Sequence, residues 1–416
     1  MKQFEQVSPK LRLASLFHAR VLDCCAILSL SLVLALTTAH AQTQQAAKSE
    51  GADPIPQPAV TAILAAFDKY EVVAMPQGHG MQDLNDFIFS LIRNPAFSEK
   101  VNDIVFESGN SLYQPILDRY MAGEDVPFTE VQKVWRKMGQ PAAGASAFVE
   151  QFYPLVRALN QKLPPQRRLR VLAGDPPIDW DQIKSMDDII RLVHRDASAA
   201  SIMEKAVLSK HRKALMLYGT FHLLHMSEVR ASAVSIYEKD YPNLTFVISD
   251  FGMFDTDLPT LSSSRFATWP IPSLARAKGT WLGALDLGHF LPPSIRIDEK
   301  DCQVHTEFPK MLQKPMEDLI DAFLYLGPQD LRLREKIPAD IALDTNYRAE
   351  FQRGAATLGF PEAASETSQE FDQQIVKSAE DPLFSIPKQP TPDPKLTQRA
   401  VQDCMERLKN RSSTPR

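Results

Sequence analysis

The chain has 416 residues, of which 44% are hydrophobic and 23% charged, and its formal net charge is −5 at pH 7. This composition is typical of a globular protein and excludes a disordered chain or a coiled coil. Because there is no basic excess to neutralise a phosphate backbone, we expect no nucleic-acid partner. The length suits one large domain with insertions, or two domains.

The first 41 residues have the features of an export signal. Basic residues precede an apolar run from Cys24 to Ala39, and Ala39-His40-Ala41 fits a small-x-small cleavage site. An uncleaved membrane anchor is the alternative, but a run of about sixteen residues is shorter than the roughly 20 that a span requires. We therefore predict a signal peptide over 1–41, no stable membrane span after cleavage, and an exported protein, either periplasmic or secreted.

Loss of residues 1–41 would leave two cysteines, Cys302 and Cys404. In an oxidising compartment these two can pair and tie the C-terminal tail to the body of the protein, or they can stay free thiols. The sequence leaves both possibilities open, because it does not give the distance between their Cα atoms.

Residues 42–58 are polar and contain several prolines, which predicts a flexible leader before a domain that we place at 59–359. Apolar residues at helical spacing predict helices at 59–70, 81–93, 186–211 and 224–239. A mostly helical insertion is expected at about 111–163, with breaks near Val126-Pro127 and Gln140-Pro141.

Short apolar runs predict strands at 71–75, 103–106, 168–173, 213–218, 244–249 and 321–326. Strands that alternate with helices indicate an α/β fold with a mostly parallel central sheet of about five to six strands, flanked by helices. Residues 251–305 are irregular, which indicates either a cover over the active site or secondary-structure elements that the pattern does not reveal. The Pro-, Gln- and Glu-rich tail at 360–416 is predicted to be partly disordered, with a terminal helix at 396–408.

Reactive side chains follow three of these strands. They are His79 in Met75-Pro76-Gln77-Gly78-His79-Gly80, Glu107 directly after Ile104-Val105-Phe106, and His222 in Leu217-Tyr218-Gly219-Thr220-Phe221-His222. Ligands of open α/β sheets bind outside the carboxyl ends of the strands, so we expect these three side chains to converge there. Two imidazoles and a carboxylate suit either acid–base chemistry or metal binding.

Each of these residues also has a structural interpretation. His79 can be a loop histidine near a helix N-terminus, Glu107 a capping carboxylate, and His222 a histidine packed under the edge of the sheet. Around them, Gln77, Gly78, Gly219 and Asp175 are candidate ligand-binding positions. For four further residues at or beyond strand ends a structural role is favoured: Asp250, His225, His289 and His305.

Several familiar active-site patterns are absent from the sequence. It contains no Gly-x-Ser-x-Gly elbow, no phosphate-binding P-loop and no His-Glu-x-x-His zinc helix. A nucleotide enzyme and a standard serine esterase are therefore disfavoured.

The motifs resemble those of the erythromycin-esterase-like superfamily, which includes ChaN-like haem-uptake lipoproteins and the TraB/Tiki proteins. Its members have a first strand ending in Gly-Glu-x-x-His, a second ending in Glu, and a later Gly-x-x-His. Gln77-Gly78-His79-Gly80, Phe106-Glu107 and Gly219-Thr220-Phe221-His222 resemble these in order, and 321–327 resembles the last core strand. The chain departs from the family at Pro76-Gln77, where the family has Gly-Glu. Glutamine can form hydrogen bonds but is neither a base nor an anionic metal ligand.

The resemblance implies two chemistries for His79, Glu107 and His222. In the esterase-like members His79 would be the general base, Glu107 would orient it, and His222 would stabilise the oxyanion or act as the acid. In the TraB/Tiki branch all three would be ligands of a divalent metal that activates water. The cofactor is accordingly none, a divalent metal or haem.

The sequence thus predicts an exported hydrolase-like protein that cleaves an ester or amide bond of a small molecule or peptide. The alternative is a non-catalytic envelope protein that binds haem, a metal or a small ligand on the same fold, as Gln77 would favour. A structural envelope protein with a vestigial cleft is a third possibility. Neither the substrate nor the oligomeric state is encoded in a recognisable pattern.

Overall fold

The computed structural model describes residues 51–78, 80–139, 146–185, 187–189, 194–226, 231–250, 263–287, 294–298, 300–307, 313–328, 331–335, 343–357, 369, 370, 373 and 394–412. These residues belong to one compact unit, Gly51–Arg416. The predicted signal peptide, His79 and His289 lie outside the described residues.

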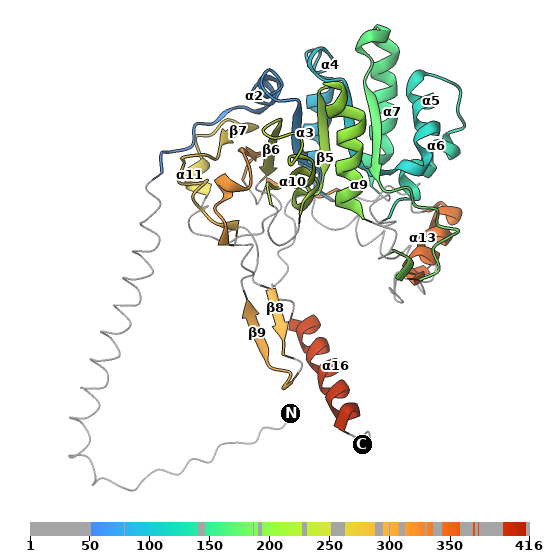
Figure 1. Ribbon diagram of the computed structural model, residues 1–416, viewed down its shortest axis with the longest axis vertical. Helices are drawn as coiled ribbons and strands as arrows, with labels where there is room; N and C mark the ends of the chain where they lie inside the picture. The colour runs from blue at the N-terminus through green and yellow to red at the C-terminus, as the bar shows by residue number, and fades with distance from the viewer. Residues whose placement is uncertain are drawn as a thin grey trace, which may run out of the picture. The chain divides into compact units, whose positions relative to one another are not determined.

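An eight-stranded mixed sheet forms the centre of this unit, in the order β1-β7-β10-β6-β2-β5-β3-β4 (Figure 1). Its strands are β1 (Gln57–Pro58), β2 (Val72–Pro76), β3 (Asp103–Asn110), β4 (Arg170–Asp175), β5 (Ala214–Tyr218), β6 (Thr245–Asp250), β7 (Ser273–Arg276) and β10 (Ala322–Tyr325). The run from β10 to β4 is parallel throughout, and β7 and β1 pair antiparallel at one edge. The predicted α/β class is confirmed. The two antiparallel strands were not predicted, and β1 belongs to the stretch expected to be a flexible leader.

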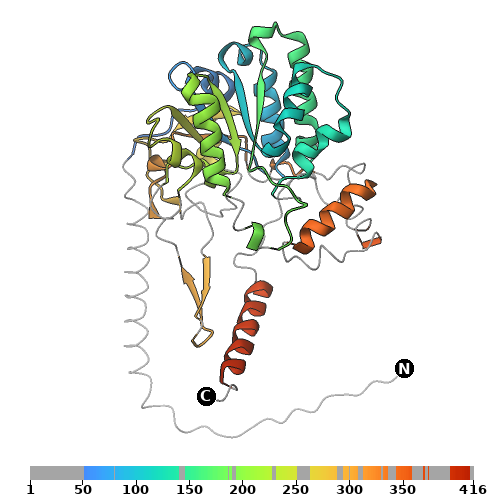
Figure 2. The same cartoon turned by 45° about the vertical axis from the view of Figure 1, so that its right-hand side comes forward.

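Helices cover both faces of the sheet. Since successive side chains of a strand point to opposite faces, apolar side chains of one strand contribute to two separate cores. Val73 and Met75 of β2 pack into the core that α2, α3 and α7 cover, whereas Val72 and Ala74 face the core of α9 and α10. Figures 1 and 2 show α9 and α10 on one side of the strands and α3 and α7 on the other. The bounds of the helices are α2 (Ala59–Ala66), α3 (Gln82–Arg93), α4 (Phe97–Lys100), α5 (Gln114–Ala122), α6 (Phe128–Arg136), α7 (Ala147–Lys162), α9 (Arg195–Ile202), α10 (Ala233–Tyr237), α11 (Ser263–Phe266) and α13 (Thr345–Thr357).

Two predicted helices have the wrong extent. The helix predicted at 186–211 is not continuous: residues 187–189 are helical, His194 has non-helical backbone angles (φ −101°, ψ 75°), and α9 begins at Arg195 and continues as a π-turn, Met203–Val207. The helix predicted at 224–239 is reduced to α10, because the Ser232 hydroxyl caps it by accepting the Ser235 N–H at 3.0 Å. Leu224 and Met226, whose spacing suggested a helix, are instead buried core residues of the preceding loop.

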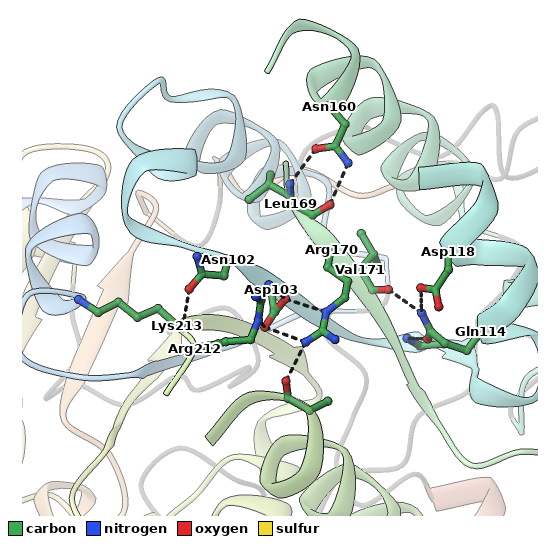
Figure 3. Close-up of polar contacts among 12 residues, drawn as sticks. Asn102, Asp103, Gln114, Asp118, Asn160, Leu169, Arg170, Val171, Arg212 and Lys213 are labelled. Atoms are coloured by element: carbon green, nitrogen blue, oxygen red, sulfur yellow. Dashed lines mark hydrogen bonds and ion pairs between the residues drawn. The ribbon is translucent and has the colours of Figure 1, made fainter. Parts of the chain in front are cut away.

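The amino ends of β3, β4 and β5 are joined by a buried carboxylate (Figure 3). Asp103 is fully buried and receives Nε of Arg170 at 2.9 Å and Nε of Arg212 at 2.7 Å. Each guanidinium also donates from Nη2 to this carboxylate, at 3.1 and 2.7 Å. Two paired cations compensate the burial of the charge. Asp103 therefore fixes these strands at the end of the sheet opposite to the predicted site.

A disulfide joins a β-hairpin to the terminal helix. β8 (Ser294–Ile297) and β9 (Val304–Glu307) form the hairpin, and Cys302 in its turn is bonded to Cys404 of α16 (Pro394–Ser412), with 5.8 Å between the Cα atoms. Of the two possibilities left open by the sequence, pairing is therefore the one observed, and the predicted terminal helix is confirmed. His305 lies in β9, outside the eight-stranded sheet. Across the described residues, no helix is both long and apolar enough to cross a bilayer.

Candidate functional site

Glu107 occupies an irregular part of β3. The strand extends to Asn110, beyond the predicted end at Phe106, but its register with β4 shifts: Phe106 is opposite Ala173, whereas Asn110 is opposite Asp175. The extra residues form a bulge, and bulges turn a side chain away from the regular alternation of a strand. Tyr153 of α7 holds the bulge by donating from its hydroxyl to the Ser108 carbonyl at 2.6 Å.

The Glu107 carboxylate is buried and has three neighbours from other elements. The backbone N–H of Gly219, directly after β5, donates to Oε2 at 2.5 Å. Nη2 of Arg195 lies 2.8 Å from Oε1, and Nε2 of His222 lies 3.8 Å from the same oxygen. The structure thus brings together Glu107, Gly219 and His222, three of the residues singled out in the sequence.

Arg195 links Glu107 to a second buried carboxylate. Its Nε donates to Oδ1 of Asp175 at 2.7 Å, and the Gly139 N–H donates to Oδ2 at 2.5 Å. Burial raises the pKa of Asp175 above its ordinary value, although Arg195 acts in the opposite direction. Burial alone would lower the pKa of Arg195, but Asp175 and Glu107 outweigh it and raise the pKa. The guanidinium is therefore a permanent cation between two carboxylates.

His222 is oriented by Asp196, in the first turn of α9. Nδ1 of His222 lies 2.7 Å from Oδ1 of Asp196, which also accepts the Ala233 N–H at 3.0 Å. Because this oxygen acts as an acceptor, we assign the imidazole proton to Nδ1, which leaves the lone pair on Nε2, the nitrogen nearest Glu107. The His222 side chain is 12% exposed, so this nitrogen lies at the margin of the buried cluster.

Next to this cluster the Tyr218 side chain packs directly against the backbone of Gly174. A Cβ added there would lie 2.1 Å from the Tyr218 hydroxyl, which donates to the Gly174 carbonyl at 2.9 Å. Burial, with Glu107 and Asp175 nearby, raises the pKa of Tyr218 well above its ordinary value. Tyr218 is therefore a neutral donor under the site, and its ring meets the His222 ring edge-on at 6.0 Å.

Gln77 lies beyond the end of β2 and is 1% exposed. Its backbone N–H donates to the Tyr218 carbonyl at 3.0 Å, and its side-chain Nε2 lies 3.5 Å from the Gly78 carbonyl. Its Oε1 is buried and accepts no hydrogen bond from any residue that the structure describes. A buried polar atom of this kind is costly unless a ligand or water satisfies it.

The start of α3 is held by the segment Leu331–Glu335. The Glu335 N–H donates to the Gly80 carbonyl at 2.9 Å, and the Gln82 N–H donates to the Leu333 carbonyl at 3.0 Å. Within this segment Arg332, 2% exposed, pairs with Asp83 and with Oδ2 of Asp250 at 3.1 Å. Asp250 thus has the structural role favoured from the sequence.

His225 lies outside the cluster. Nδ1 is 2.8 Å from Oε2 of Glu238, and Nε2 is 3.3 Å from Oδ2 of Asp321. Burial alone would lower its pKa, but the two carboxylates outweigh this effect and raise the pKa from 6.5 to about 9. His225 therefore joins α10 to the start of β10 as a structural cation.

Arg195 and Asp196 were not anticipated from the sequence. Both belong to the first turn of α9, and the helix predicted to start nine residues earlier concealed that turn. One signal could have revealed them. An Arg-Asp pair at the start of a helix follows a strand that ends in a candidate residue, Asp175, so both residues lie near the carboxyl edge of the sheet. Whether His79 joins the cluster stays a prediction.

The described residues do not fit a metal centre. No group of three or more His, Cys, Asp or Glu side chains among them is arranged to hold a metal ion. A cation already lies between the two buried carboxylates, since Arg195 contacts both Glu107 and Asp175. His222 uses Nδ1 for Asp196, which leaves only Nε2 for a ligand.

The fold and this cluster define an α/β protein with a charged, partly buried site at the carboxyl edge of its sheet. No family model and no curated protein matches the chain. A Bacillus cereus protein of known crystal structure is similar to it, with 10% identity and a TM-score of 0.42, over 70% of this chain and 97% of that one. ChaN of Campylobacter jejuni, solved with cofacial heme, has 14% identity and a TM-score of 0.31, over 46% of this chain and 84% of that one. The erythromycin-esterase and TraB/Tiki parts of the motif resemblance stay predictions.

Proposed function

We propose that the carboxyl edge of β3 and β5 is a metal-independent acid–base site that hydrolyses an ester or amide bond. The observation that supports this proposal is the arrangement of Asp196, His222 and Glu107. One carboxylate contacts the imidazole through Nδ1, and Nε2 lies 3.8 Å from a second carboxylate. A carboxylate-oriented histidine is a common general base in hydrolysis.

In the proposed reaction, Nε2 of His222 removes a proton from water as the water oxygen bonds to the substrate carbonyl carbon. The carbon–oxygen or carbon–nitrogen bond then breaks, and the leaving group takes the proton from Nε2, which restores the neutral imidazole. Asp196 stabilises the transient imidazolium. Glu107, fixed by Arg195 and the Gly219 N–H, orients the attacking water. These contacts favour His222 as the base, the role that the family resemblance implies for His79.

The proposal includes export to the periplasm or the medium. The signal-like sequence at 1–41 motivates it, and the Cys302–Cys404 disulfide agrees with an oxidising compartment.

The test is hydrolysis of a panel of nitrophenyl esters and peptide anilides by the purified chain. We expect turnover of at least one ester, and a loss of roughly 10²–10⁴-fold in His222→Ala. His211→Asn is the matched control, because His211 is 85% exposed and lies outside the cluster. Equal rates for the wild type and His222→Ala across the panel would overturn the proposal.

A second candidate function is binding without turnover, and the unsatisfied Oε1 of Gln77 favours it. A ligand with an N–H or O–H group, or a metal ion that the amide oxygen coordinates, would satisfy this oxygen. The probes are haem, Zn²⁺ and Mn²⁺, titrated into wild type and Gln77→Leu and followed by absorbance or thermal shift. Saturable binding that Gln77→Leu weakens, with no ester turnover, would replace the hydrolase proposal by this one.

A further inference from the structure

A cavity lies away from this site, at the antiparallel edge of the sheet. Its volume is about 480 Å³, and it lies between α2, β7 and residues 52–57. Ligand sites for small molecules usually have volumes of this order. None of its lining residues belongs to the Glu107–His222 cluster.

One wall of this cavity is an arch formed by residues 52–57, which is anchored at both ends. At one end the Ala52 N–H donates to the Gly279 carbonyl, and the Trp281 N–H donates to the Ala52 carbonyl, both at 3.0 Å. At the other end β1 pairs with β7 in register, Gln57 opposite Leu274. Pro54 and Pro56 between these anchors lack the N–H that strand pairing requires. The arch therefore stands off the sheet edge and leaves a preformed space beneath it.

The anchor near Ala52 requires a glycine. A Cβ on Gly51 would lie 2.4 Å from both the Thr280 carbonyl carbon and the Trp281 nitrogen, closer than real Cβ contacts. Close backbone approach at this position seats the arch against the loop after β7.

The inner surface of the cavity is apolar and aromatic. Ala62, Ala65 and Ala66 of α2 contribute small side chains, and Tyr70 and Phe246 contribute rings whose centroids are 5.2 Å apart. The small residues leave the volume open. Both rings are buried, and Lys69 Nζ lies over the Tyr70 ring, 4.9 Å from its centroid.

The rim of the cavity is cationic. Lys69, Arg276 and Lys278 line it, against one acid, Asp53. Among the described residues no carboxylate lies within ion-pair distance of these three cations, whereas many other basic side chains of the chain are paired. The Arg276 guanidinium lies over the Phe246 ring, 4.3 Å from its centroid. A stacked guanidinium is held in place while its N–H edge stays free for a bidentate carboxylate.

We propose that this cavity binds a small organic anion, a carboxylate attached to an apolar body. The apolar body would lie against Ile55, Ala62 and Ala65, and the carboxylate would be bound by Arg276 and Lys278. The inference is independent of the hydrolase proposal, because no residue is shared between the two sites.

The test is a calorimetric titration of the full chain with 2-naphthoate, alongside acetate and 2-naphthalenemethanol. The first comparison probe carries the charge without the ring, and the second the ring without the charge. We expect 2-naphthoate to bind at one site per chain and at least about tenfold more tightly than either comparison probe.

Two variants localise the binding. Arg276→Gln combined with Lys278→Gln removes the cations, and Ala65→Trp fills the cavity from the exposed face of α2; each is expected to weaken 2-naphthoate at least about tenfold. Lys162→Gln, on the surface of α7, is the matched control and His222→Ala the control for the other site; both should bind normally. No binding of 2-naphthoate, binding no tighter than that of acetate, or equal binding by wild type and both cavity variants would each overturn the proposal.

Discussion

Asp196 accepts from His222 and from the backbone of Ala233 with the same carboxylate oxygen, at 2.7 and 3.0 Å. That double role ties the imidazole to the junction of α9 and α10 and fixes which of its nitrogens carries the proton. An asparagine at this position can present its NH₂ group to Nδ1, which would favour the opposite tautomer.

Asp196→Asn is therefore expected to lower hydrolysis roughly 10²–10⁴-fold. The tautomer is read from the ¹⁵N shifts of the His222 ring: protonated Nδ1 in the wild type and protonated Nε2 in the variant. An unchanged tautomer together with unchanged turnover would show that Asp196 does not set the orientation or tautomer of His222.

Arg195→Leu is expected to destabilise the fold by roughly 3–5 kcal/mol, because it leaves Glu107 and Asp175 buried without their cation. Arg195→Lys should recover only part of this loss, since an ammonium does not reproduce a planar fork. The measurement is the free energy of unfolding in urea. The matched control is Arg119→Leu, whose pair with Glu124 is more than half exposed on both sides, and which should cost about 1 kcal/mol or less. A similar cost for the two substitutions would contradict the cluster as described.

The ion pairs of His225 are expected to make the free energy of unfolding decrease as the pH rises into the alkaline range. The pKa of His225 is raised from 6.5 to about 9 in the folded chain, so the folded state holds this proton more tightly than the unfolded state does. The stabilisation is complete below about pH 6.5 and is lost as the pH rises through about 9, at most about 3.4 kcal/mol in all. Denaturation in urea at pH 6 and pH 9.5 measures this difference.

His225→Gln should remove that pH-dependent part while the wild type retains it. His211→Gln serves as the control, because the His211 side chain is 85% exposed. If the wild type and His225→Gln lose the same stability between the two pH values, other groups cause the loss.

The Asp103 carboxylate gives a prediction at the opposite end of the sheet. Asp103→Leu leaves Arg170 and Arg212 without their buried partner and is expected to cost roughly 3–5 kcal/mol. Asp103→Asn keeps acceptor capacity for one guanidinium and should cost less. Because this residue lies at the amino ends of the strands, turnover per folded molecule should not change. A specific loss of turnover in Asp103→Asn would show that the two ends of the sheet are coupled.

The parallel strands and part of the cluster could be predicted from sequence, and the reason is physical. β2, β3 and β5 are apolar on both faces because helices cover both sides of the sheet, which marks them as short uninterrupted runs. Glu107 and Gly219 follow from strand order alone, because carboxyl ends of parallel strands share an edge. His222 follows in the same way.

The remaining features depend on information that is not local. Arg195 and Asp196 were missed because an apolar period runs through residues 186–211, while the backbone turns out of the helix at His194. β1 has two residues and β7 four, too few for a pattern. The partners in the Cys302–Cys404 disulfide are 102 residues apart, and those in the Arg332–Asp83 ion pair are 249 apart. Only the folded chain brings them together.

The most direct test of the proposed site is the rate of ester hydrolysis by metal-free protein, after dialysis against EDTA, for wild type and His222→Ala on the same substrate. The account predicts that wild type keeps its full rate without metal and that the variant loses roughly 10²–10⁴-fold. A wild-type rate that disappears on dialysis and returns with a divalent ion would contradict it, as would a variant that retains the wild-type rate.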